Sequence, residues 1–124
     1  MYRIKTLNKI SSVGLARLDR ERFQVGSDVE NEDGVLVRSA PMHEYEFSSS
    51  LRAIARAGAG TNNIPVDRCS ENGVVVFNTP GANANAVKEL VIAAMLIASR
   101  DILGGADWVQ EQAHTPKVDV AAAV

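Results

Sequence analysis

Two glycines and two arginines in the first half of the chain have the types and spacing to bind a small anion. Gly58 and Gly60 follow an apolar stretch in the segment LRAIARAGAGTNN. Without glycine side chains in the way, the backbone N–H groups of Gly58, Ala59 and Gly60 can face a hollow at the carboxyl end of a parallel strand. Arg56 precedes this turn, and Arg38 ends an earlier apolar segment.

If the two segments are neighbouring strands, both guanidinium groups could contact one phosphate. Charge-assisted contacts of this kind contribute about 1.5–3 kcal/mol each. A simpler interpretation is that the glycines form an ordinary turn and that the arginines are solvated. The spacing alone favours this simpler interpretation.

The glycine loop does not match a dinucleotide-binding fingerprint. The pattern G-x-G-x-x-G requires a third glycine, and Asn63 stands at that position. It also requires an acidic residue about 20 positions further on, where this chain has Asn78 and no carboxylate. No Gly-Lys-Ser/Thr follows the loop, so a Walker loop is excluded as well. The loop therefore fails as a dinucleotide signature, and a small anion is the ligand that it could still bind.

Hydrophobic patterning predicts the elements that must position this loop. Strands are expected over residues 2–7, 22–26, 34–39, 51–57 and 74–78, and helices over residues 11–18, 64–72 and 86–103. Ser11 or Ser12 would cap the first helix, Asn63 would cap the second, and Gly73 would end it. Strands that alternate with short helices imply a mostly parallel α/β sheet with helices on both faces.

Composition and charge restrict the classes of function. The 124 residues suit one globular domain, and a net charge of −2 gives no general attraction to nucleic acid or to an anionic membrane. The N-terminus lacks the apolar core of a secretory signal. The single cysteine, Cys69, excludes an internal disulfide and fits a reducing compartment, so a cytoplasmic protein is expected. No cluster of residues has metal-ligand spacing.

The segment RAGAGTNNIPVDRCSENGVVVFNTPGANANAVKEL resembles the D-isomer-specific 2-hydroxyacid dehydrogenases, most closely the members that oxidise D-3-phosphoglycerate. The resemblance implies a flavodoxin-like substrate domain, with an NAD-binding Rossmann domain inserted after the long helix. It implies that this chain stops before that insertion and is inactive by itself. Residues 1–85 would be the substrate-binding domain, 86–103 an inter-domain and dimer-interface helix, and 104–124 a helix and linker.

The resemblance also suggests residue roles. The amides of Gly58, Ala59 and Gly60 match the family loop that binds the substrate carboxylate, and Ala59 matches a position that also touches the cofactor. Arg38 and Arg56 match basic positions that hold the phosphate of a phosphorylated 2-hydroxyacid. The remaining match, Asn83, corresponds to an asparagine that lines the cleft between domains. No catalytic residue is expected in this chain, and NAD would be bound mainly by the missing domain.

The helix expected over residues 86–103 contains the run LVIAAMLIA, which is apolar around its whole circumference. Such a helix needs neighbours on every side. It could be a central core helix of a single domain. The resemblance instead places it against the Rossmann domain and a partner subunit, so a homodimer through residues 87–103 is expected. The run is too short to span a bilayer.

Two classes of function remain open from the sequence. One is the substrate-binding part of a dehydrogenase for 3-phosphoglycerate or for another D-2-hydroxyacid, such as lactate or glycerate. The other is a non-catalytic module that binds or senses a small anion. A coding sequence that continues past Val124 into G-x-G-x-x-G would favour the enzyme. His43, His114 and Cys69 match no catalytic motif, and Cys69 is expected to be a buried thiol.

Overall fold

The computed structural model describes residues 1–114 and 119–123. The chain divides into two compact units, Met1–Ala82 and Asn83–Val124. The first unit contains a sheet and two short helices, and the second contains helices only. The glycine loop belongs to the first unit.

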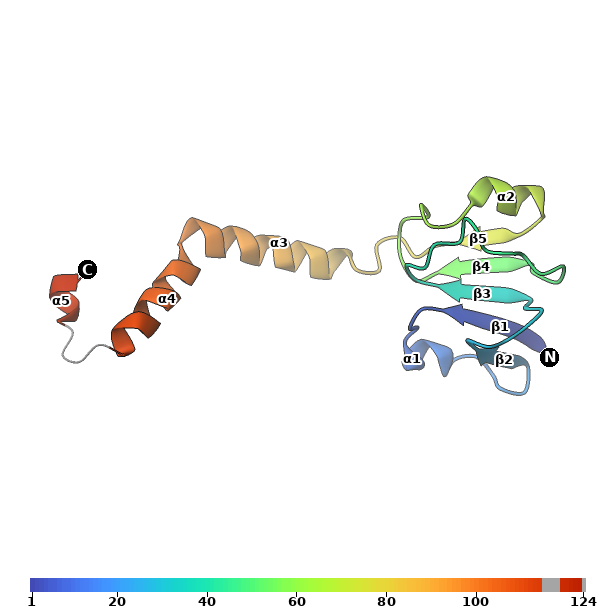
Figure 1. Cartoon of the computed structure of the whole chain (residues 1–124), viewed down its shortest axis with the longest axis horizontal. Helices are drawn as coiled ribbons and strands as arrows, with labels where there is room; N and C mark the ends of the chain where they lie inside the picture. Colours follow the sequence, from blue (N-terminus) through green and yellow to red (C-terminus); the bar gives the residue numbers. More distant parts are fainter. Residues whose placement is uncertain (115–118, 124) are drawn as a thin grey trace. The chain divides into compact units, whose positions relative to one another are not determined.

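The first unit is built on five parallel strands, which Figure 1 shows with their arrows pointing the same way. The strands are β1 (Tyr2–Leu7), β2 (Phe23–Gly26), β3 (Gly34–Val37), β4 (Ala53–Arg56) and β5 (Val75–Phe77). Their order across the sheet is β2-β1-β3-β4-β5. This is the flavodoxin-like order. The predicted α/β fold is confirmed, although all strands except β1 are shorter than predicted.

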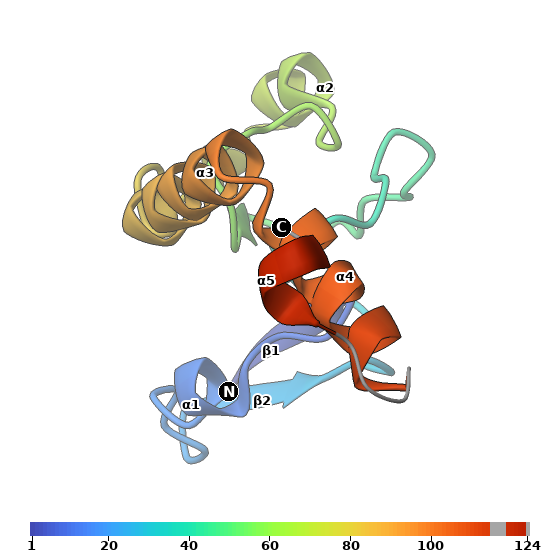
Figure 2. The same cartoon turned by 90° about the vertical axis from the view of Figure 1, so that its left-hand side faces the viewer.

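Helices α1 (Ser12–Leu15) and α2 (Val66–Glu71) lie on opposite faces of the sheet (Figure 2). The register explains this placement, because Val35 pairs with Ile54 and both side chains face α2. Val25 pairs with Ile4, and Ile4 pairs with Gly34, the residue before Val35. The side chain of Val25 therefore faces the other side of the sheet, where it lines a hollow with Leu15 of α1. Successive strand side chains alternate between faces, so the two helices cover different sides.

The helix boundaries differ in part from the prediction. Pro65, and not Asn63, occupies the N-cap position of α2. The side-chain amide of Asn63 donates instead to the carbonyl of Ala40 at 2.9 Å. Ser11 is the N-cap residue of α1, but its side chain makes no capping hydrogen bond. Gly73 follows α2 with φ +68°, a conformation that favours glycine, so its predicted role in ending the helix agrees with the structure.

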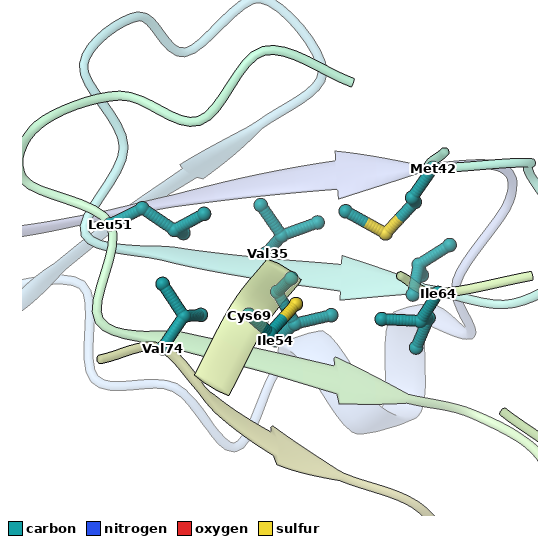
Figure 3. Close-up of a cluster of buried hydrophobic side chains, with 8 residues drawn as sticks. Val35, Met42, Leu51, Ile54, Ile64, Cys69 and Val74 are labelled. Atoms are coloured by element: carbon teal, nitrogen blue, oxygen red, sulfur yellow. The ribbon is translucent and has the colours of Figure 1, made fainter. Parts of the chain in front are cut away.

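The hydrophobic core lies between the sheet and α2, together with the segment that connects β3 to β4 (Figure 3). Val35 and Ile54 supply its strand side, and Met42 and Cys69 cover them from the connecting segment and from α2. Cys69 is fully buried, which confirms the predicted buried thiol. Burial raises the pKa of the Cys69 thiol, and the charge of Arg68 opposes this shift.

The second unit contains α3 (Ala84–Ser99), α4 (Ile102–Ala113) and α5 (Val120–Ala123). The prediction of one continuous helix over residues 86–103 is wrong, because the chain breaks at Asp101. This residue has φ 44°, and its carboxylate accepts a hydrogen bond from the amide of Gly104, which caps α4. A side chain that caps a new helix competes with continuation of the preceding one. The linker predicted near the C-terminus falls partly on residues 115–118 and 124, outside the described residues.

Within the described residues, no helix combines the length and the apolar character needed to cross a membrane. Helix α3 buries none of its residues, and the side chains of Leu90 and Met95 are 71% and 67% exposed.

Candidate functional site

The carboxyl ends of β3, β4 and β5 bring three chain segments to one edge of the sheet. Arg38 follows β3, the loop of residues 57–62 follows β4, and Asn78 follows β5. Ligands of open parallel α/β sheets bind at this edge. The topology therefore places the predicted loop and both predicted arginines where a ligand site is expected.

All three carbonyl groups of the Gly58–Gly60 turn accept hydrogen bonds from the protein. The amide of Thr79 donates to the carbonyl of Gly58 at 3.0 Å. The side-chain amide of Asn78 donates to the carbonyl of Ala59 at 2.7 Å. Nη1 of Arg56 donates to the carbonyl of Gly60. The turn is thus fixed by donors that lie at the carboxyl end of β4 and directly after β5.

The three amides of the same turn are unpaired. In the part of the chain that the structure describes, no protein acceptor bonds to the N–H of Gly58, Ala59 or Gly60. Ala59 and Gly60 are exposed, so solvent or a ligand can reach the turn. Unpaired amides beside held carbonyls form a surface with partial positive charge, which suits an anion.

The two glycines make room for the guanidinium of Arg56. Neither glycine has a positive φ, so backbone conformation does not require them. A Cβ at Gly60 would lie only 2.9 Å from Nη1 of Arg56, and a Cβ at Gly58 would lie 3.4 Å from Cζ. The loop and the side chain are therefore packed against one another.

The structure joins the two predicted arginines through one backbone group. Nε of Arg56 donates to the carbonyl of Arg38 at 2.9 Å, so Arg56 connects the end of β3 with the loop after β4. Two nitrogen atoms of Arg56 are thereby engaged within the protein, and Nη2 has no hydrogen bond among the described residues. The side chain of Arg38 is exposed and has no partner in that part of the chain. Contact of either arginine with a phosphate stays a prediction.

Comparison with known proteins assigns the family. Residues 4–123 match the family described as D-isomer specific 2-hydroxyacid dehydrogenase, catalytic domain. The chain belongs to this family. The match covers both units, and it confirms the resemblance found in the sequence. Within the D-2-hydroxyacid dehydrogenases, the chain corresponds to the substrate-binding domain.

Relatives with different substrates are similarly close. A hydroxypyruvate reductase from Thermotoga maritima is 44% identical over 73 residues, which are 56% of this chain and 24% of the reductase. A D-3-phosphoglycerate dehydrogenase from Bacillus subtilis is 33% identical over 114 residues, which are 82% of this chain and 22% of the dehydrogenase. The chain therefore spans about a quarter or less of the length of these curated relatives.

A solved structure supports the same assignment. The NAD+-bound 3-phosphoglycerate dehydrogenase of Entamoeba histolytica matches with a TM-score of 0.64 and 28% identity. The match covers 77% of this chain and 38% of that one. Solved relatives in the dehydrogenase family hold either NAD+ or NADP.

Asn83, the remaining predicted site residue, belongs to the second unit. It occupies the N-cap position of α3, and its carbonyl accepts from the amide of Val87 at 3.1 Å. Its side chain makes no capping hydrogen bond. Asn83 and the glycine loop belong to different units, so the role of Asn83 in a cleft between domains stays a prediction.

Asn8 is a residue of this edge that the sequence analysis missed. It follows β1 and adopts φ 68°, in the left-handed region that asparagine tolerates better than most residues. Its Oδ1 accepts from the amides of Ser39 and Ala40 at 3.0 and 2.6 Å. Asn8 therefore holds the chain where it leaves β3, next to Arg38. An asparagine directly after an apolar strand was the available signal.

In the sequence, Asn78 stands out only as a non-acidic residue where the dinucleotide fingerprint needs a carboxylate, and nothing there predicts its bond to the Ala59 carbonyl. His43, which matches no catalytic motif in the sequence, is exposed, and its Nε2 lies 3.0 Å from the carbonyl oxygen of Asn62. Among the described residues, no group of three side chains could hold a metal ion.

Proposed function

We propose that the chain is the substrate-binding part of an NAD-dependent D-3-phosphoglycerate dehydrogenase. Such an enzyme oxidises the C2 hydroxyl of 3-phosphoglycerate to a ketone at the start of serine synthesis, with NAD as the hydride acceptor. The observation that carries the proposal is the Gly58–Gly60 turn. Its three carbonyls accept hydrogen bonds from the protein, while its three amides have no protein acceptor among the described residues.

The turn would bind the carboxylate of the substrate. A carboxylate oxygen can accept from a backbone amide that already points at it, and each such charge-assisted bond contributes about 1.5–3 kcal/mol. Because the turn is held before the ligand arrives, little conformational freedom is lost on binding. The site would thereby fix the position of C2 relative to groups supplied from outside this chain.

The arginines favour a phosphorylated substrate. The exposed side chain of Arg38 and Nη2 of Arg56 start from adjacent strand ends, β3 and β4. Guanidinium groups bind phosphate strongly because their planar N–H donors match its oxygen atoms. A second candidate function, supported by the likeness to a hydroxypyruvate reductase, is the same domain of a reductase that acts on hydroxypyruvate.

The residues of this chain do not themselves fit a dinucleotide. Asn63 replaces the third glycine of the fingerprint, and the amide of Asn78 is directed to the carbonyl of Ala59 where a carboxylate would be needed for ribose. NAD would therefore be held mainly by a separate nucleotide-binding domain, with Ala59 as the one position here that is proposed to touch it. The isolated chain is proposed to be inactive.

Calorimetric titration of the chain with D-3-phosphoglycerate and with D-glycerate tests the substrate class. Arg38→Ala is expected to weaken phosphoglycerate binding about tenfold or more while changing glycerate binding little, because one phosphate contact is lost. Arg52→Ala is the matched control, since Arg52 is also exposed but precedes β4 at the opposite edge of the sheet. Equal losses for both ligands would contradict the phosphate assignment and favour the reductase.

We further propose that the chain forms a homodimer through residues 87–103. This range covers most of α3 and the first two residues of α4. The proposal rests on exposed apolar side chains, of which Leu90 and Met95 are the most exposed in α3. Their burial against a second copy would remove apolar area from water, at about 25 cal/mol per Å².

A further inference from the structure

The hydrogen bonds to the loop carbonyls determine where the next amides point. A trans peptide is planar, and its C=O and N–H lie on opposite sides of the C–N bond. The described part of the chain contains no cis peptide bond. A donor that holds the carbonyl of one residue therefore turns the N–H of the next residue away from that donor.

Applied to this loop, the rule changes which amides form the binding surface, from those of residues 58–60 to those of residues 59–61. The carbonyls of Gly58, Ala59 and Gly60 are held by donors from β4 and from the segment after β5. The amides that these bonds direct are those of Ala59, Gly60 and Thr61. In the described residues the amide of Thr61 has no protein acceptor either. No donor holds the carbonyl of Ala57 in that part of the chain, so nothing comparable directs the Gly58 amide.

We infer that Asn78 is a positioning residue for the loop surface formed by the amides of Ala59, Gly60 and Thr61, where the proposed substrate carboxylate would lie. The inference rests on the proposed function of the loop. Asn78 holds the Ala59–Gly60 peptide through the 2.7 Å bond from Nδ2 to the Ala59 carbonyl. It thereby presents the Gly60 amide without touching the ligand.

Asn78 is the one of the three donors that can be removed cleanly. The donor to Gly58 is a backbone amide, which substitution cannot delete. Removal of Arg56 would also remove a positive charge and its bond to Arg38. Asn78 is uncharged and exposed, and it lies outside the hydrophobic core. Its truncation should therefore leave the fold intact.

Asn72 provides a matched control. Its Nδ2 also donates to a backbone carbonyl, that of Arg68, at 2.7 Å. It lies at the end of α2, away from the glycine loop in sequence and at a different carbonyl. Asn72→Ala therefore removes the same kind of bond from the same kind of exposed site.

The test is a nuclear magnetic resonance titration of the isotope-labelled full chain with D-3-phosphoglycerate. The amide signals of Ala59, Gly60 and Thr61 are expected to shift more than that of Gly58. Asn78→Ala should weaken binding about tenfold, as expected when a bond that orients a charge-assisted contact is lost. Asn72→Ala should bind as the unmodified chain does, and Asn78→Gln, which retains the amide donor, should recover part of the affinity.

Each alternative outcome has a distinct meaning. Unchanged affinity in Asn78→Ala, or a Gly58 shift as large as the other three, would overturn this inference while leaving the loop as the binding site. Loss of affinity in both Asn78→Gln and Asn72→Ala would also overturn it, because the effect would then be a general weakening of the fold. Absence of any phosphoglycerate binding by the unmodified chain would overturn the proposed function and this inference together.

Discussion

Arg56 of β4 and Gly60 of the loop that follows it are packed against each other. Nη1 of Arg56 donates to the carbonyl of Gly60, and a Cβ on Gly60 would lie 2.9 Å from the same nitrogen. The φ of Gly60 is not positive, so what glycine provides at this position is space for the guanidinium. The arginine in turn connects the loop to the carbonyl of Arg38.

Gly60→Ala should displace the Arg56 guanidinium and loosen the loop. We expect phosphoglycerate affinity to fall about tenfold, because the orientation of a charge-assisted contact is lost. Calorimetric titration measures this change. Gly14→Ala in α1 is the control, since a Cβ there meets no atom within 4 Å. Equal affinities of the two variants would show that the close packing has no role in binding.

Asn8 should contribute to stability through both its side chain and its conformation. Asn8→Gly removes the bonds to the amides of Ser39 and Ala40 but tolerates φ 68°. Asn8→Ala removes the same bonds and adds strain of about 1–2 kcal/mol in the left-handed region. Urea unfolding should rank the unmodified chain above Asn8→Gly and Asn8→Gly above Asn8→Ala. An alanine variant as stable as the glycine variant would contradict the backbone part of this account.

The strands of the sheet could be predicted from the sequence because buried parallel strands are short apolar runs. GVLVRS and VVVFN are such runs, and both contain a strand in the structure. The glycine loop could be located as well. The bonds that hold the loop could not be predicted, because their partners are distant in sequence: Arg56 and Arg38 are 18 residues apart, and Asn78 and Ala59 are 19 apart. Only the strand order brings them together.

The break between α3 and α4 was missed for a different reason. The apolar pattern continues through Ile102 and Leu103, so periodicity alone extends the helix to residue 103. The competing signal was Asp101, a residue type that caps helices. Its bond to the amide of Gly104 starts α4 anew. A local side-chain bond therefore decided a boundary that hydrophobic patterning could not detect.

Alkaline pH should destabilise the first unit. Burial raises the pKa of Cys69 above its ordinary value of 9.0. The pKa of Tyr45 is also raised, by burial and then by its hydrogen bond to Glu32 and the charge of that carboxylate. The unfolded chain then releases protons at lower pH than the folded chain does, so the free energy of unfolding is fully retained below pH 9 and falls as pH rises further.

Urea unfolding between pH 7 and pH 11 measures this dependence. Tyr45→Phe removes one of the two titrating groups and should flatten the decline. Tyr2→Phe is the control, because Tyr2 is exposed. Stability that rises with pH in this range, or the same decline in Tyr45→Phe as in the control, would contradict the assignment.

The proposed homodimer predicts a molar mass of twice that of the chain, which is 13.3 kDa. Replacement of Leu90 and Met95 by serine should convert it to a monomer, because the apolar area that drives association is lost. Light scattering coupled to size exclusion measures the mass. Val13→Ser is the control, since Val13 is 77% exposed but lies on α1. If the unmodified chain is monomeric at high concentration, the proposed homodimer is contradicted.

The most direct measurement is a crystal structure of the chain with D-3-phosphoglycerate bound. We predict that the ligand's carboxylate oxygens lie about 2.7–3.2 Å from amide nitrogens of the loop after β4, the usual range for such bonds. The phosphate should lie beside the guanidinium of Arg38. A ligand bound away from this sheet edge, or one whose carboxylate faces solvent while the loop amides bind only water, would contradict the account.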